Sequence, residues 1–84
     1  MQNLKRYGVT PEWYEDALAA QGGGCAICGG VNAKSGHRLA VDHDHETGEV
    51  RGLLCNNCNS AIGKLQDRSA VARLAVAYLE KWGR

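Results

Sequence analysis

Two Cys-x-x-Cys pairs, Cys25/Cys28 and Cys55/Cys58, constrain this chain more than any other feature. A chain of 84 residues buries only a small core, and domains of this size commonly need a metal or disulfides to fold. Each pair places two sulfurs on one knuckle, and two knuckles make a tetrahedral site. Such a site leaves no coordination position open, so we expect a structural metal in a single domain spanning residues 1–84.

Disulfides are the competing use of the four cysteines. The N-terminus carries no apolar run after Lys5 and Arg6, so no signal peptide is predicted. No stretch approaches the roughly 20 apolar residues of a membrane span, so no membrane association is predicted either. In a cytoplasmic, reducing setting paired cysteines more often bind metal, which favours a metal site. Iron stays an alternative to zinc, because both metals accept four thiolates.

The local sequence patterns predict a small α+β fold. Thr10 and Pro11 begin a helix that the glycines at 22–24 end. Residues 25–30 form a tight metal-binding turn, and residues 31–37 a polar loop. Two short strands, 38–41 and 50–54, are expected to pair as a hairpin with a long polar connection. The predicted architecture is therefore a zinc-stapled hairpin plus helix, flanked by an N-terminal and a C-terminal helix.

Two helices are expected after the hairpin. The first follows the second cysteine pair and runs to Leu65, and Asp67 or Ser69 caps the second. The second has an apolar stripe at helical spacing, made of Val71, Leu74, Ala75, Tyr78 and Leu79. We expect this stripe to cover the core, with partner binding as the alternative. Trp13 and Tyr14 of the first helix are expected to pack in or against the core rather than to stack on bases.

The run Asp42-His43-Asp44-His45-Glu46 is the second informative feature. It follows the apolar residues 39–41, and a solvated loop would explain one or two such charges but not this alternation. Carboxylate oxygens suit Mg²⁺, and a neutral imidazole can act as a base near pH 7. The run therefore predicts a functional site.

Asn59 directly follows the last cysteine, so a metal that fixes Cys58 also fixes Asn59. If the hairpin packs against the helix that follows, Asn59 can face Asp42. One carboxylate and one amide oxygen would leave several water positions on Mg²⁺, which is the usual arrangement for phosphate chemistry. A helix cap is the structural alternative for Asn59, and both roles can hold together.

The net charge does not identify a partner. The formal value is +1, and a zinc-loaded site lowers it to about −1, because four thiolates outweigh one Zn²⁺. Affinity for nucleic acid would therefore depend on how the charges are placed.

These motifs resemble a known family. The segments that carry the likeness are Leu39-Ala40-Val41-Asp42-His43-Asp44-His45-Glu46-Thr47-Gly48 and Val50-Arg51-Gly52-Leu53-Leu54-Cys55-Asn56-Asn57-Cys58-Asn59. With residues 7–12 and 25–29, they resemble the phage recombination endonuclease VII family, a branch of the HNH (His-Me finger, ββα-metal) nucleases. The likeness extends from about residue 7 to residue 80.

The resemblance implies a phage-encoded, metal-dependent DNA endonuclease in the host cytoplasm that leaves 5′-phosphate and 3′-hydroxyl ends. It implies a structural zinc on the four cysteines, and Asp42 and Asn59 as ligands of a catalytic Mg²⁺ or Mn²⁺. It makes His43 the general base, and we expect His45 to contact phosphate or support the site. Arg51 is expected to contact phosphate or to form a salt bridge with Glu46 or Glu49.

DNA is the expected partner, bound mainly through its phosphates, and other DNA-processing proteins of the phage are a further class. One site per chain implies a nicking enzyme that is a monomer or weak dimer. The junction-resolving members of the family are longer, so a bare nuclease module is expected rather than junction resolution. The rival from another class is a non-catalytic zinc module that binds DNA or protein, and a third alternative is a redox iron site.

Overall fold

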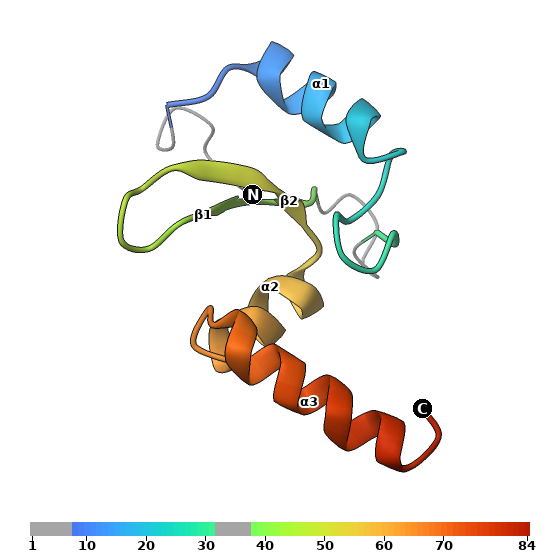
Figure 1. Cartoon of the computed structure of the whole chain (residues 1–84). Helices are drawn as coiled ribbons and strands as arrows, with labels where there is room; N and C mark the ends of the chain where they lie inside the picture. The colour runs from blue at the N-terminus through green and yellow to red at the C-terminus, as the bar shows by residue number, and fades with distance from the viewer. Residues whose placement is uncertain (1–7, 32–37) are drawn as a thin grey trace.

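The computed structural model describes residues 8–31 and 38–84, so most of the predicted polar loop lies outside the described residues. Two strands and three helices follow one another in the order α1 (Pro11–Ala20), β1 (Ala40–His43), β2 (Val50–Leu54), α2 (Asn56–Lys64) and α3 (Ser69–Lys81). The strands form an antiparallel hairpin with α1 on one side and α2 and α3 on the other (Figure 1). The predicted α+β class is confirmed. Within the described ranges, none of the helices is both long enough and apolar enough to cross a bilayer.

Helix α1 begins and ends where the sequence predicts. The Oγ1 of Thr10 accepts a hydrogen bond from the N–H of Trp13 at 3.0 Å, and Pro11 occupies the first turn. Gly22 and Gly23 end the helix with φ of 71° and 86°, values that side chains with a Cβ rarely adopt. Tyr14 is buried, and its hydroxyl donates to the carbonyl oxygen of Leu39 at 2.7 Å. The core role predicted for Tyr14 is thus confirmed.

The hairpin contains an irregularity that matters for the site. Asp42 pairs with Gly52, but the next residue of β1, His43, pairs with Val50. Arg51 is therefore an extra residue in β2, as in a β-bulge, and bulges re-aim side chains. Asp42 and His43 belong to β1 itself, whereas the sequence placed them after the strand.

The core lies between α1, the hairpin and the two cysteine segments. Its buried members are Tyr14, Cys25, Leu39, Val41, Leu53, Leu54 and Cys55. Trp13, Leu18 and Ile62 are partly buried against them, which agrees with the packing role predicted for Trp13. A cluster this small supports the expectation that the chain needs a metal as a staple.

Helix α2 begins earlier than predicted. It starts at Asn56, so the second cysteine pair lies at the start of the helix rather than before it. Cys55 is the N-cap residue, and its Sγ accepts from the N–H of Cys58 at 3.4 Å. The cap role considered for Asn59 is therefore filled by a cysteine.

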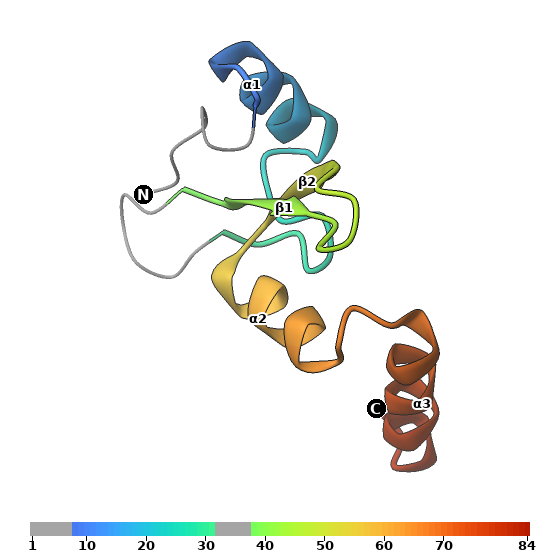
Figure 2. The same ribbon diagram turned by 90° about the vertical axis from the view of Figure 1, so that its left-hand side faces the viewer.

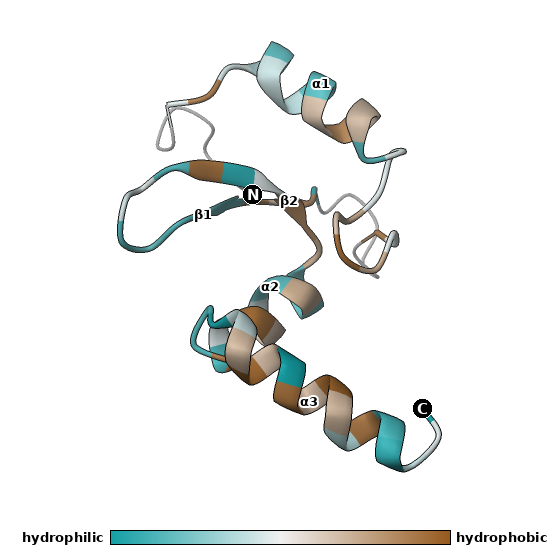
Figure 3. Ribbon diagram, in the orientation of Figure 1, coloured by the Kyte–Doolittle hydropathy of each residue, from teal (hydrophilic) through white to brown (hydrophobic). Residues whose placement is uncertain are grey.

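Two expectations for the last helix are wrong. Asp67 and Ser69 do not cap α3: its N-cap residue is Arg68, which makes no side-chain capping bond. The apolar stripe does not cover the core, because Leu74 and Tyr78 are 70% and 66% exposed. Figure 2 shows α3 pointing away from the hairpin, and Figure 3 shows hydrophobic residues along its length. A periodic stripe predicts a helix with an apolar face but does not specify what covers that face.

Candidate functional site

The four cysteines come together as predicted. Their sulfur atoms all lie within 4.8 Å of one another, and they are the one such group of Cys, His, Asp or Glu side chains found in residues 8–31 and 38–84. Cys28 and Cys55, from different knuckles, have sulfurs 3.7 Å apart. A Zn–S bond of about 2.3 Å predicts a tetrahedral sulfur–sulfur edge of about 3.8 Å. The arrangement therefore fits a four-sulfur metal site, and the sulfurs are too far apart for disulfide bonds.

Backbone hydrogen bonds shape the first knuckle. The N–H of Cys25 donates to the carbonyl oxygen of Gly30 at 2.7 Å, and the N–H of Gly29 donates to that of Cys25 at 2.9 Å. The sulfurs of Cys25 and Cys28 accept N–H groups two residues further on, each at 3.4 Å. Such donors stabilise thiolates, the form that binds a metal.

The pKa values of two of the thiols, Cys25 and Cys58, are shifted in opposite directions. Burial raises the pKa of the Cys25 thiol, but hydrogen bonds from neighbouring backbone N–H groups outweigh it and bring that pKa down to about 6. Burial, together with hydrogen bonds to the other cysteines, raises the pKa of Cys58 to about 12. A metal cation would stabilise the thiolate form of the four cysteines and so lower the pKa of Cys58.

The side chain of Gln21 fastens the first knuckle to β2. Its Nε2 donates to the carbonyl oxygens of Gly24 and Leu53, at 2.8 Å and 2.9 Å. Its Oε1 accepts the N–H of Leu53 at 3.0 Å. The amide thus pairs with Leu53 as a neighbouring strand would, and it fixes the residue that precedes Cys25.

Asp42 is held by Arg51. The guanidinium donates from Nε to Oδ2 at 2.8 Å and from Nη2 to Oδ1 at 3.1 Å, and Asp42 is only 8% exposed. This is a two-point pair between a planar guanidinium and a carboxylate, the strong form of such a contact. The predicted metal ligand is therefore oriented and partly engaged.

The same guanidinium binds a second carboxylate. Arg51 donates from Nη1 and Nη2 to the two oxygens of Asp67, at 3.0 Å and 2.9 Å. Hydrogen bonds to Asp42 and Asp67 raise the pKa of Arg51 well above its ordinary value, and the bond from Arg51 lowers the pKa of Asp67. The expected salt bridge of Arg51 exists, but its partners are Asp42 and Asp67 rather than Glu46 or Glu49.

The two histidines lie beside each other where the hairpin leaves β1. The rings of His43 and His45 have centroids 5.0 Å apart and are tilted by 41°. Asp44, between them, accepts the N–H groups of Glu46 and Thr47 at 2.8 Å and 3.1 Å, so its role is to form the turn. The bonds from Thr47 and Glu46 lower the pKa of Asp44.

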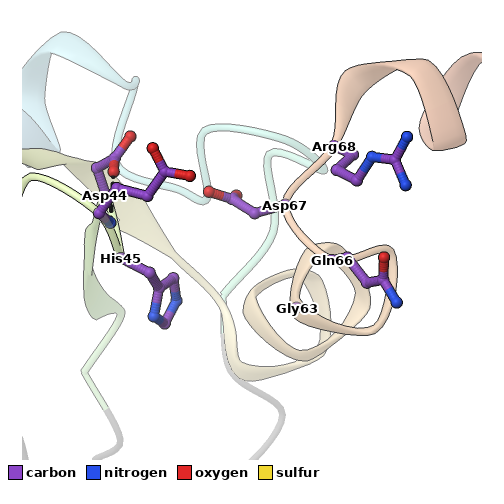
Figure 4. Close-up of a pocket in the computed structure, with 7 residues that line it drawn as sticks. Asp44, His45, Gly63, Gln66, Asp67 and Arg68 are labelled. Carbon is purple, nitrogen blue, oxygen red and sulfur yellow. Dashed lines mark hydrogen bonds between the residues drawn. The ribbon is translucent and has the colours of Figure 1, made fainter.

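A cleft of about 520 Å³ lies between this turn and the link from α2 to α3. It is lined by Asp44, His45, Glu46, Gly63, Gln66, Asp67 and Arg68. Figure 4 shows His45 and Asp67 coming from the two sides of this cleft. Asn59 is exposed on α2 and is not among the described residues that line the cleft.

Sequence reasoning missed the roles of Gln21 and Asp67. No local signal in the sequence indicates that Gln21 contacts Leu53, 32 residues away. Asp67 was expected to cap a helix. Its position after Gln66 could have indicated a tight turn, because aspartate tolerates a left-handed backbone better than most residues.

Comparison with known proteins places the chain in a family. The family model described as recombination endonuclease VII matches residues 1–81, so the chain belongs to that family. The chain is 48% identical over 79 residues to the Gene 59 protein of Mycobacterium phage D29, covering 93% of this chain and 47% of that protein. It is 46% identical over 77 residues to the Gene 59 protein of Mycobacterium phage L5, covering 90% of this chain and 46% of that protein. The chain thus spans about half the length of these curated relatives, and no solved structure matches it.

Proposed function

We propose that this member of the recombination endonuclease VII family is a metal-dependent DNA endonuclease of the HNH type that nicks duplex DNA. The observation that carries the proposal is the position of His43 at the end of β1, next to the oriented carboxylate of Asp42. Phosphodiester hydrolysis requires a base close to an oxygen ligand of a metal ion, whereas a module that only binds DNA or protein requires neither group.

Zinc is the metal we propose for the four cysteines, because their sulfur spacing fits a closed tetrahedral site. Its role is structural. It joins the first knuckle to the start of α2 and so fixes where Asn59 stands.

Mg²⁺ or Mn²⁺ is the metal we propose for Asp42 and Asn59, whose oxygen donors suit a hard cation. A carboxylate has about four lone-pair positions, and Arg51 uses one on each oxygen of Asp42. The donor chemistry therefore fits, although the cation must share Asp42 with a guanidinium. When bound, such an ion polarises the phosphoryl group and stabilises the leaving 3′ oxygen.

The protein's own groups supply the proton transfer and the positioning. Neutral His43 takes a proton from the water that attacks the phosphorus. The bond between phosphorus and the 3′ oxygen then breaks, which leaves a 5′-phosphate and a 3′-hydroxyl end. His45, with its ring beside that of His43, is proposed to contact a phosphate or to support the base. Binding depends mainly on phosphates and should weaken as salt rises. We place the activity in the host cytoplasm, with other phage DNA-processing proteins as further partners and a monomer or weak dimer as the active form.

Cleavage of supercoiled plasmid tests the proposal. Wild type with Mg²⁺ or Mn²⁺ should convert supercoiled DNA to the nicked form, and His43→Ala should reduce the rate by about 100-fold or more, the usual contribution of a general base. Asp16→Asn, on the exposed face of α1, is the matched control and should nick at the wild-type rate.

Two results would overturn the assignment. Intact plasmid with every divalent metal would favour the non-catalytic zinc module that binds DNA or protein. Equal nicking by His43→Ala would mean that another group is the base.

Metal analysis of the purified protein should return about one zinc per chain, and iron in its place would support the redox alternative.

A further inference from the structure

Arg51 connects two parts of the molecule that are distant in sequence. It is the extra residue of β2, and it reaches Asp42 on β1 and Asp67 in the link between α2 and α3. Four hydrogen bonds between 2.8 Å and 3.1 Å hold the guanidinium between the two carboxylates. One positive charge is thus shared by two negative ones.

The backbone that presents Asp67 is unusual. Gln66 and Asp67 have φ of 59° and 57°, in the left-handed region that residues with a Cβ avoid. The N–H of Asp67 donates to the carbonyl oxygen of Ile62 at 2.8 Å, and that of Gln66 to Gly63 at 3.0 Å. This pattern is the Schellman ending of a helix, in which glycine normally occupies the position of Gln66. The link is therefore fixed by hydrogen bonds, and it presents the carboxylate of Asp67 to Arg51.

Because Arg51 binds both carboxylates, Asp67 affects how readily Asp42 can bind a cation. A cation approaching Asp42 is repelled by the positive charge of Arg51 and competes with it for the same oxygens. Asp67 binds the opposite edge of the guanidinium and offsets part of that positive charge. The charge of Asp67 is balanced by Arg51 and by the solvent that reaches this partly exposed side chain, so Asp67 does not require a metal ion.

We propose that Asp67 is a positioning residue of the nuclease site: by binding Arg51, it keeps Asp42 accessible to a divalent cation. The proposal rests on the proposed function, in which Asp42 is a ligand of Mg²⁺ or Mn²⁺. It also gives the junction between α2 and α3 a role in metal loading, since movement of this junction would shift Arg51 toward Asp42 or away from it.

Binding of Mn²⁺ to the zinc-loaded protein, followed by electron paramagnetic resonance of the free ion, tests this without an activity assay. Asp67→Asn should weaken Mn²⁺ binding by about three- to tenfold, because the positive charge of Arg51 would then be balanced by Asp42 alone. Arg51→Gln should strengthen binding, because it removes the competitor. In the double variant, Asp67→Asn should change the Mn²⁺ affinity less than twofold relative to Arg51→Gln alone, since Asp67 acts through Arg51.

Three outcomes count against the proposal. An unchanged Mn²⁺ affinity in Asp67→Asn would refute it, and so would an equal loss with and without Arg51, because the effect would then be a general one of charge. If Asp42→Asn binds Mn²⁺ as wild type does, the metal assignment in the proposed function fails as well, which separates the two failures. Zinc content and circular dichroism establish that each variant is folded, and the equally uncharged Arg51→Met replaces Arg51→Gln if the latter is not.

Discussion

Gln21→Ala should destabilise the fold by about 2–4 kcal/mol, although Gln21 lies outside both proposed metal sites. The change removes three hydrogen bonds, two to the backbone of Leu53 and one to the carbonyl oxygen of Gly24. Leu53 is fully buried at 0% exposure, so water cannot readily replace the lost partner.

The magnitude follows from which groups lose their partner. The carbonyl oxygen of Leu53 keeps the N–H of Ala26 as a donor at 3.1 Å, so its loss is small. The N–H of Leu53 loses the acceptor Oε1 of Gln21, and a buried donor without a partner costs about 1–3 kcal/mol. The bond to Gly24 adds about 1 kcal/mol. For a domain of this size, whose total stability is on the order of 4–13 kcal/mol, this is a large fraction.

Urea unfolding of the zinc-loaded protein measures this loss, with free zinc held constant because ligand binding changes apparent stability. Gln21→Glu is an informative second variant: it keeps an acceptor for the N–H of Leu53 but directs a carboxylate at two carbonyl oxygens, so it should also destabilise. Glu15→Gln on the exposed side of α1 should have no effect. A loss below about 0.5 kcal/mol in Gln21→Ala would refute the account, because it would fall within the range of ordinary surface substitutions.

Three further predictions follow from backbone and charge. Gln66→Gly should stabilise the fold by up to about 1 kcal/mol in thermal unfolding, and Gln66→Ala should give no such gain, because only glycine relieves the left-handed backbone. Gly24→Ala should weaken zinc affinity in chelator competition, since a Cβ there would collide with the carbonyl oxygen of Gly29; unchanged affinity would contradict this. The pKa of Asp67 is lowered by Arg51, so the pair's contribution to stability is complete above the unfolded value of about 3.9 and is lost only as pH falls through the lower folded value. The stability difference between wild type and Asp67→Asn should therefore be constant from about pH 5.5 to 8.5, and a decline toward pH 5.5 would show that the sign is wrong.

The features that sequence alone predicted are those with local signals. The start of α1 depends on Thr10 and Pro11, which are adjacent to the helix they begin. The cysteine cluster depends on two short spacings and on the demand of a small chain for a metal. The hairpin depends on two short apolar runs that flank a polar turn.

The features that sequence missed depend on contacts between distant residues. A one-residue irregularity in β2 makes Arg51 a partner of Asp42, and no local pattern specifies strand register at that level. The exposure of the stripe on α3 depends on the turn at Gln66 and Asp67, whose left-handed backbone directs the helix away from the core. Periodicity predicted this helix but could not predict its direction.

Strand β2 links the four-cysteine cluster to the proposed nuclease site. At one end of β2, Arg51 orients Asp42; at the other, Leu54 leads directly into Cys55 and the four-sulfur cluster. Between them Leu53 is held by Gln21 and by Ala26 of the first knuckle. Three residues thus separate Arg51, which holds the proposed ligand Asp42, from Cys55, the first proposed zinc ligand after β2, and the strand is anchored from both sides. Loss of zinc would free the end of β2 and the start of α2 together, so the proposed ligands Asp42 and Asn59 would lose their common frame even though neither contacts the zinc.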